Sequence, residues 1–177
     1  ILLGLDKKGD DLYNIWVSND MQRDIDGRVR IIVEDMEGNQ MFAFSEKADV
    51  KANSCYRLPN MVSINMLNKK KSECYARVIF MEDDTILSER IHFFTYPKDL
   101  ELIETEINPN INFKDGKYYI EFTTDVFVKD LCIEASVRGD FSKNFFDVVP
   151  NVTQIVVFEP EDKNKNDVKF KFKMYNR

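Results

Sequence analysis

The sequence is short of the residues from which most enzyme sites are built. Histidine occurs once, as His92, whereas nucleophilic triads and transition-metal centres generally draw on histidine. The surrounding alternation places His92 in a strand, on a solvent or interdomain face. The GxGxxG and GxxxxGK[ST] loops that cradle dinucleotides and phosphates are missing from the sequence as well. We therefore predict no catalytic residue, no cofactor and no metal site in this chain.

Cysteine is also scarce. The three residues Cys55, Cys74 and Cys132 allow at most one disulfide and leave one thiol over, which is a poor framework for a disulfide-dependent secreted domain. Cys55 and Cys74 have no CxxC partner, so a zinc site is not indicated. Because free cysteine is among the most buried residue types, we predict three reduced core residues.

Long apolar runs and an excess of positive charge are missing too. No stretch reaches the ~20 apolar residues of a membrane span, and a net charge of −6 gives no footprint for nucleic acid. We expect neither a membrane nor a nucleic acid as partner. The chain opens on Ile1, not Met, and 1–5 is too short for a signal-peptide core. We expect a fragment whose targeting signal lies upstream; localisation is left open, with a bacterial periplasmic or secreted parent as one option.

What the sequence does contain is aromatic residues in alternating runs. Its 14 Phe and 7 Tyr, set against 6 Gly and 5 Pro, suit strands, where aromatic side chains pack well on a pleated surface. Apolar and polar residues alternate with the period of half-buried strands. The predicted strands are 1–5, 12–18, 28–34, 41–45, 61–67, 74–81, 85–94, 107–113, 117–124, 129–136, 152–158 and 168–174.

This pattern predicts an all-β fold of two tandem immunoglobulin-like β-sandwich domains. About a dozen strands at spacings near 10 residues fit two consecutive sandwiches better than one barrel. We place the first domain at 1–97 and the smaller C-terminal one at 98–177, because Pro97 cannot donate to a sheet ladder and should end the preceding strand.

Polar clusters between the runs predict tight turns, in which glycine supplies the positive φ. The clusters are 7–11, 24–27, 37–39, 82–84 and 114–116. The last strand has the clearest pattern, since its apolar residues should face a core while the intervening lysines face water. These apolar residues are Val168, Phe170, Phe172 and Met174.

Acidic residues are numerous, but most fall in turns such as 82–84 and 159–162, where a solvated loop is the ordinary explanation. Glycosidase chemistry needs a carboxylic acid and an ionised carboxylate on either side of a sugar cleft. The sequence places no such pair.

Trp16, the only tryptophan, leaves two interpretations open. It lies on the same pleat face as Leu12 and Asn14, opposite the apolar face that carries Ile15 and Val17. The first interpretation is core or interdomain packing. The second is a ligand platform, because a pyranose ring presents apolar C–H groups to an aromatic face.

Two motifs carry a family resemblance. The segment 93–102, FFTYPKDLEL, is followed about forty residues later by 139–150, GDFSKNFFDVVP, and then by 156–160, VVFEP. In this order the segments resemble the C-terminal region of β-mannosidases, which belong to glycoside hydrolase family 2. The opening segment 10–20 resembles the first strand of their penultimate domain. Coverage is therefore essentially the whole chain.

The resemblance implies a larger parent enzyme. That parent would have an N-terminal jelly roll, an immunoglobulin-like domain, a TIM barrel with two catalytic glutamates and then these two sandwiches, and it would hydrolyse terminal β-D-mannosyl residues with retention. A TIM barrel alone needs ~250 residues, so no family catalytic residue carries over. Lys143 stands where the family usually has Asp, and Asn151 where Gly is usual.

The segment 141–147 can be interpreted from its residues alone. Its side chains Phe141, Phe145 and Phe146 would act as aromatic anchors, and Ser142, Asn144 and Asp147 would bond nearby backbone to hold an irregular turn. The loop would then brace its sandwich or dock on a neighbouring domain.

The leading hypothesis is thus an accessory region without catalytic activity, with the upstream domains of the parent as partner and with Trp16, Phe145 and Phe146 as candidate sugar or interdomain contacts. The alternatives are a carbohydrate-binding module for a mannose-containing oligosaccharide and a bacterial surface array of immunoglobulin-like repeats. A homodimer is a further option.

Overall fold

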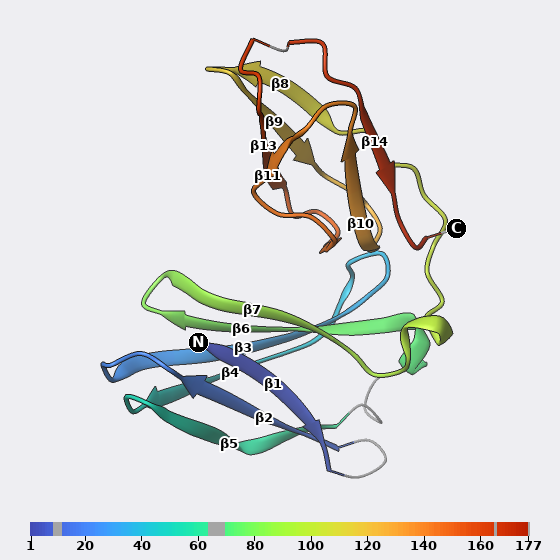
Figure 1. The fold of residues 1–177 in the computed structure, drawn as a ribbon. Coiled ribbons are helices and arrows are strands. Elements are labelled where there is room, and N and C mark those ends of the chain that lie inside the picture. The colour runs from blue at the N-terminus through green and yellow to red at the C-terminus, as the bar shows by residue number, and fades with distance from the viewer. Residues whose placement is uncertain (9–11, 64–69, 165, 177) are drawn as a thin grey trace. The chain divides into compact units, whose positions relative to one another are not determined.

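The computed structural model describes residues 1–8, 12–63, 70–164 and 166–176 (Figure 1). It separates into two compact units. The first unit contains 1–35 and 39–101, and the second contains 36–38 and 102–177. The helices of the described residues are single 3-10 turns, η2 (Lys71–Glu73) and η3 (Pro97–Asp99). Neither turn is long and apolar enough to cross a membrane.

The first unit is built from two antiparallel sheets (Figure 1). One has the order β1-β2-β5 and the other the order β4-β3-β6-β7. The strands are β1 (Leu2–Lys7), β2 (Leu12–Asn19), β3 (Ile25–Asp35), β4 (Gln40–Val50), β5 (Ser54–Ser63), β6 (Cys74–Glu82) and β7 (Thr85–Phe93). A single cluster of buried side chains from both sheets forms the core between them.

Strand β3 shows why these residues form a sandwich. Val29, Ile31 and Val33 are 0 % exposed and alternate with residues on the opposite pleat, so one face of the strand is fully apolar. Ile31 lies opposite Val78 of β6 and Phe44 of β4, which places three apolar side chains side by side on the core face.

The second unit also has two antiparallel sheets, of orders β11-β13-β9-β8 and β12-β10-β14. Its strands are β8 (Asn110–Lys114), β9 (Lys117–Phe122), β10 (Val128–Ala135), β11 (Gly139–Phe141), β12 (Phe146–Val148), β13 (Gln154–Pro160) and β14 (Phe170–Lys173). Aromatic rings fill its core edge to face. Phe172 meets Phe122 with ring centroids 5.7 Å apart, and Phe170 meets Phe158 at 5.5 Å.

The predicted fold class is confirmed. The structure consists of antiparallel sheets with immunoglobulin-like architecture, and the apolar residues of the last strand, Val168, Phe170, Phe172 and Met174, pack on the core as the alternation indicated. The predicted turns at Gly38 (φ +78°) and Gly116 (φ +75°) have the expected positive φ.

Several local predictions were wrong. The segment 24–27 is no turn, because Gly27 lies within β3, opposite Ala48 of β4. A Cβ added to Gly27 would lie 2.4 Å from Phe80 Cζ. Close packing, not a turn, therefore requires this glycine. Strand β5 begins at Ser54, and part of the predicted strand 61–67 lies outside the described residues, as does part of the turn 7–11. The short strands β11 and β12 were missed.

Candidate functional site

Trp16 lies on the outer pleat of β2, half-buried, between the core residues Ile15 and Val17. Its cross-strand partner on β1 is Gly4. A Cβ added to Gly4 would lie 2.2 Å from Trp16 Cε2, so the indole rests directly on the glycine backbone. This contact gives the ring a packing role in its own sheet; whether it also contacts sugar stays a prediction.

Phe145 and Phe146 are neighbours in sequence but lie in opposite environments. Phe146, in β12, packs on the core of the second unit with its ring centroid 6.0 Å from that of Phe122. Phe145 is 72 % exposed and has φ +56°, a left-handed conformation that is unusual for a bulky side chain. Of the two phenylalanines, Phe146 thus braces its own sandwich and Phe145 does not; whether Phe145 docks on a neighbouring domain or contacts sugar stays a prediction.

The predicted bonds of the polar residues in this loop are confirmed. Asn144 Nδ2 donates to the Ile133 carbonyl at 2.8 Å, and Asn144 Oδ1 accepts from the Ile133 N–H at 2.8 Å and from the Phe145 N–H at 3.0 Å. On the other side, Ser142 Oγ accepts from the Val157 N–H at 2.9 Å. The loop is thus fixed to β10 by Asn144 and to β13 by Ser142, two residues that precede Phe145 in the sequence.

Asp147 closes the same loop. Its Oδ1 accepts from the Asp130 N–H at 3.0 Å and lies 3.3 Å from Lys129 Nζ. Burial raises the pKa of this carboxyl above its ordinary value, although both partners act in the opposite direction. Asp147 therefore holds the loop to β10, and burial of its carboxylate disfavours the charged form.

Lys143 is the residue at which the family resemblance led us to expect Asp. Its Nζ donates to Gln154 Oε1 at 2.5 Å and lies 4.4 Å from the centroid of the Phe146 ring. Gln154 Nε2 in turn donates to the Asp147 carbonyl at 3.1 Å. Burial lowers the pKa of the Lys143 ammonium. Lys143 thus helps to hold the loop through Gln154.

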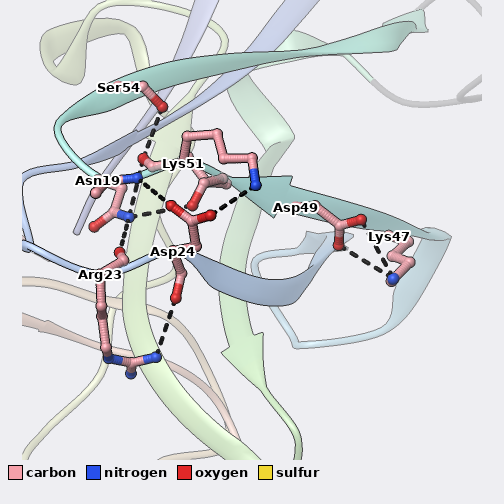
Figure 2. A network of polar contacts seen from close by, with 9 residues as sticks. Asn19, Arg23, Asp24, Lys47, Asp49, Lys51 and Ser54 are labelled. Atoms are coloured by element: carbon pink, nitrogen blue, oxygen red, sulfur yellow. Dashed lines mark hydrogen bonds and ion pairs between the residues drawn. The ribbon is translucent and has the colours of Figure 1, made fainter.

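The opening motif has a structural role of the same kind. Asn19, at the end of β2, is 0 % exposed. Figure 2 shows its amide among the neighbouring turns, where Nδ2 contacts the carbonyls of Arg23 at 2.8 Å, Lys51 at 3.1 Å and Val50 at 3.2 Å. One side chain therefore satisfies carbonyl groups of two different turns.

Asp24 ties the same turns from the other side (Figure 2). Its carboxylate accepts from Lys51 Nζ at 2.6 Å and from the Ala52 N–H at 2.9 Å, and the bond from Lys51 holds its pKa below the ordinary value. Lys47 pairs with Asp49 further along β4 at 3.3 Å. These groups are satisfied by one another, which is the pattern of a structural network.

His92 lies in β7 and is partly buried, in edge contact with Tyr13 and Phe94 at centroid distances of 5.4 and 5.5 Å. Its Nε2 is buried and has no hydrogen-bond partner among the described residues. Burial, and secondarily the charge of Arg90, lowers its pKa. The placement in a strand is confirmed.

The cysteines agree only in part with their prediction. All are free, but Cys55 is exposed, Cys74 is buried and Cys132 is intermediate. Cys55 was wrongly placed in the core. It pairs with Ser18 across the sheet, on the outer pleat that also carries Trp16. Across the described ranges, no group of three or more His, Cys, Asp or Glu side chains is arranged to hold a metal ion.

A polar pocket in the second unit was missed by the sequence analysis. Its volume is about 350 Å³, and seven residues line it: Thr105, Glu106, Asn108, Thr123, Thr124, Asp125 and Asn151. They come from three separate segments of the chain, so spacing gave no signal. The run Thr123-Thr124-Asp125 directly after β9 was the one local hint.

Family comparison accounts for both halves of the chain. Residues 11–99 match the Mannosidase Ig/CBM-like domain, and residues 102–176 match the Ig-fold domain of the mannosidase group. The chain belongs to the mannosidase Ig/CBM-like family. These mannosidase-type domains are immunoglobulin-like accessory domains of the kind found in glycoside hydrolases of family 2. No curated protein has a matching sequence.

Solved structures agree with the fold of the mannosidase-type domains. A β-D-mannosidase from Dictyoglomus thermophilum superposes with a TM-score of 0.75 at 14 % identity, over 98 % of this chain and 22 % of that enzyme. The exo-chitosanase CsxA from Amycolatopsis orientalis gives 0.66 at 10 % identity, over 98 % and 25 %. The chain thus spans a quarter or less of the length of either enzyme.

Proposed function

We propose that the chain is the C-terminal accessory region of a retaining β-mannosidase that hydrolyses terminal β-D-mannosyl residues. In this proposal the catalytic barrel lies upstream of Ile1. The main support for the proposal is that two mannosidase-type domains follow one another in this chain. A β-D-mannosidase superposes on 98 % of the chain, across both domains.

The use made of the motif residues supports an accessory role. Asn19, Asn144 and Asp147 all bond to backbone groups of their own unit. Side chains committed to holding turns are not available to bind substrate. The proposal therefore assigns the motifs to folding and positioning, and the chemistry to the parent enzyme.

Phe145 is our candidate for the contact with the upstream domains. A large aromatic side chain that is 72 % exposed gains free energy when it is covered. The bonds of Asn144 and Ser142 hold its loop in place before any partner arrives, which lowers the entropy cost of binding. An apolar pocket on a folded domain of the parent fits this arrangement.

Two experiments test the proposal. The purified 177-residue chain is expected to leave an aryl β-mannoside unhydrolysed, and clear turnover would overturn the accessory role. The reading frame upstream of Ile1 is expected to encode a barrel with two catalytic glutamates. Repeated sandwich domains in its place would favour the surface array.

The proposed contact of Phe145 is tested by comparing the change in stability that one substitution causes in the isolated chain and in the parent enzyme, because the two changes should have opposite signs. Phe145→Asn relieves a strained residue in the isolated chain and should stabilise it, whereas in the parent enzyme the same change should lower the melting temperature. The control is Tyr96→Asn, which alters an aromatic residue that is 74 % exposed in the first unit. Equal effects of Phe145→Asn in chain and parent would contradict the contact.

A further inference from the structure

The outer pleat of the sheet β1-β2-β5 carries the only tryptophan of the chain. Trp16 lies in the central strand β2, opposite Gly4 of β1 and Arg57 of β5. Both neighbouring strands engage the backbone of a central strand, so the exposed part of this half-buried residue belongs to its side chain. Asp6 is the next residue on this pleat of β1. We call Asp6, Trp16 and Arg57 together the Trp16 face.

Gly4 holds one edge of the indole. A Cβ at Gly4 would lie 2.2 Å from Cε2 and Cζ2 of Trp16 and 2.5 Å from its Nε1. The indole therefore occupies the space that a side chain on β1 would need, and the part that stays exposed is the part away from Gly4. An aromatic ring fixed in this way loses little conformational entropy when a ligand covers it.

An irregularity in the sheet brings Arg57 next to the indole. Asn14 pairs with Met61, and a regular ladder continuing from there would place residue 59 opposite Trp16. The register shifts between Asn14 and Trp16, so that Arg57 lies opposite Trp16 instead. Shifts of this kind re-aim side chains and are frequent beside functional sites. Residues directly opposite on one pleat lie ~5 Å apart at Cβ, so Arg57 is within reach of a ligand on the indole.

Arg57 and Asp6 meet across strand β2. Arg57 Nη2 lies 3.9 Å from Asp6 Oδ2, and the two side chains are 65 % and 54 % exposed. That separation is too long for a hydrogen bond, and a guanidinium carries five donors. A donor group and an acceptor group are therefore accessible beside the indole.

The ring and the charges together decide between ligand classes. Asp6 disfavours an anion and Arg57 disfavours a cation, which leaves a neutral ligand. An apolar protein surface is disfavoured as well, because covering the pair would strip both charges of water. A pyranose ring meets each requirement, since its apolar C–H groups suit the indole while its hydroxyls can pair with Arg57 and Asp6.

We propose that the Trp16 face binds one pyranose ring of a neutral saccharide. The C–H groups of the sugar pack on the exposed part of the indole, Arg57 donates to its hydroxyl oxygens, and Asp6 accepts from its hydroxyl groups. The inference goes beyond the accessory role and stands independently of the proposed β-mannosidase parent, because it uses the first unit alone. For a single ring the affinity should be on the order of millimolar.

The test is an NMR titration of the whole chain with methyl β-mannoside, methyl β-glucoside and N-acetylglucosamine in parallel, and with adenosine, a flat aromatic ligand, in a separate arm. At least one sugar is expected to shift the single indole N–H signal and the amide signals of 4–6, 16 and 57 saturably. No sugar-induced shift well above millimolar concentration, sugar-induced shifts elsewhere only, or saturation by adenosine alone would overturn the proposal.

Arg57→Met and Asp6→Ala are the decisive variants. Both residues are more than half exposed, so the fold should be retained. Each change should lower the sugar affinity about tenfold, the loss expected for one hydrogen bond to a charged group. Trp16→Ala should abolish binding. The matched control is Lys47→Met on the other sheet, a cation that is 60 % exposed, and it should leave the affinity unchanged. Undiminished binding in Arg57→Met and Asp6→Ala, or an equal loss in Lys47→Met, would overturn the assignment.

Discussion

Asn144 pairs with Ile133 as a strand residue would, except that its side chain takes the place of the backbone. The Asn144 amide donates to the Ile133 carbonyl and its oxygen accepts from the Ile133 N–H, each at 2.8 Å. Strand β12 begins only at Phe146, so the side chain extends the pairing of β10 beyond the end of its neighbour.

Replacing Asn144 with Leu should therefore cost the second unit about 1–3 kcal/mol in free energy of unfolding, because two backbone groups of Ile133 lose their partners. Chemical denaturation monitored by circular dichroism measures the loss. The matched control is Asn112→Leu on the exposed edge strand β8, which should change stability little. Equal losses in the two variants would show that the Asn144 bonds contribute nothing specific.

The two phenylalanines of the loop should respond in opposite directions. Phe146→Ala removes a ring that packs on the core and should cost about 2–4 kcal/mol. Phe145→Asn should instead raise stability by up to about 1 kcal/mol, because an L-residue with a bulky side chain is strained at positive φ and Asn is less so. Thermal unfolding of both isolated variants checks this. A large loss for Phe145→Asn would mean that the exposed ring contributes to the fold.

Gly4 and Trp16 should be strongly coupled. Gly4→Ala forces a methyl group into the indole and should destabilise the first unit, whereas the same change in a Trp16→Ala background should be tolerated. A double-mutant cycle is expected to give a coupling energy of about 0.5–3 kcal/mol. Additive effects would show that the ring moves aside without cost.

His92 should give the chain a pH-dependent stability below neutrality. Because its pKa is lowered in the folded state, the unfolded chain binds the proton more readily. The stabilisation is complete above the ordinary value of ~6.5 and is lost as the pH falls from there toward the folded pKa.

The only histidine of the chain makes this measurable directly. Its ring proton signal should titrate below the ordinary value in the folded protein, and His92→Phe should remove the pH dependence between about 6.5 and the folded pKa. A titration at the ordinary value would show that the ring is solvated.

The features that the sequence predicted well are those encoded locally. The alternation of Val29, Ile31 and Val33 specifies a buried face, because side chains of a strand point to its two sides in turn. Gly27 was wrongly assigned to a turn, because the ring that requires a glycine there belongs to Phe80, which lies on another strand. Strands of three residues such as β11 are too short to show a period.

The candidate sites divide in the same way. The bonding of Ser142, Asn144 and Asp147 followed from residue type and proximity in the chain. The contrast between Phe145 and Phe146 could not be predicted from residue type, because it depends on the left-handed backbone conformation of Phe145. The polar pocket of the second unit could not be predicted, because residues 105–108, 123–125 and 151 meet only in the folded unit.

The position of Trp16 has a spectroscopic consequence. The only tryptophan belongs to the first unit and is half-buried against Gly4, so its fluorescence should follow the unfolding of that unit alone. Far-ultraviolet circular dichroism follows the strands of both units. The difference between the two signals will therefore separate the unfolding of the second unit from that of the first, without any label.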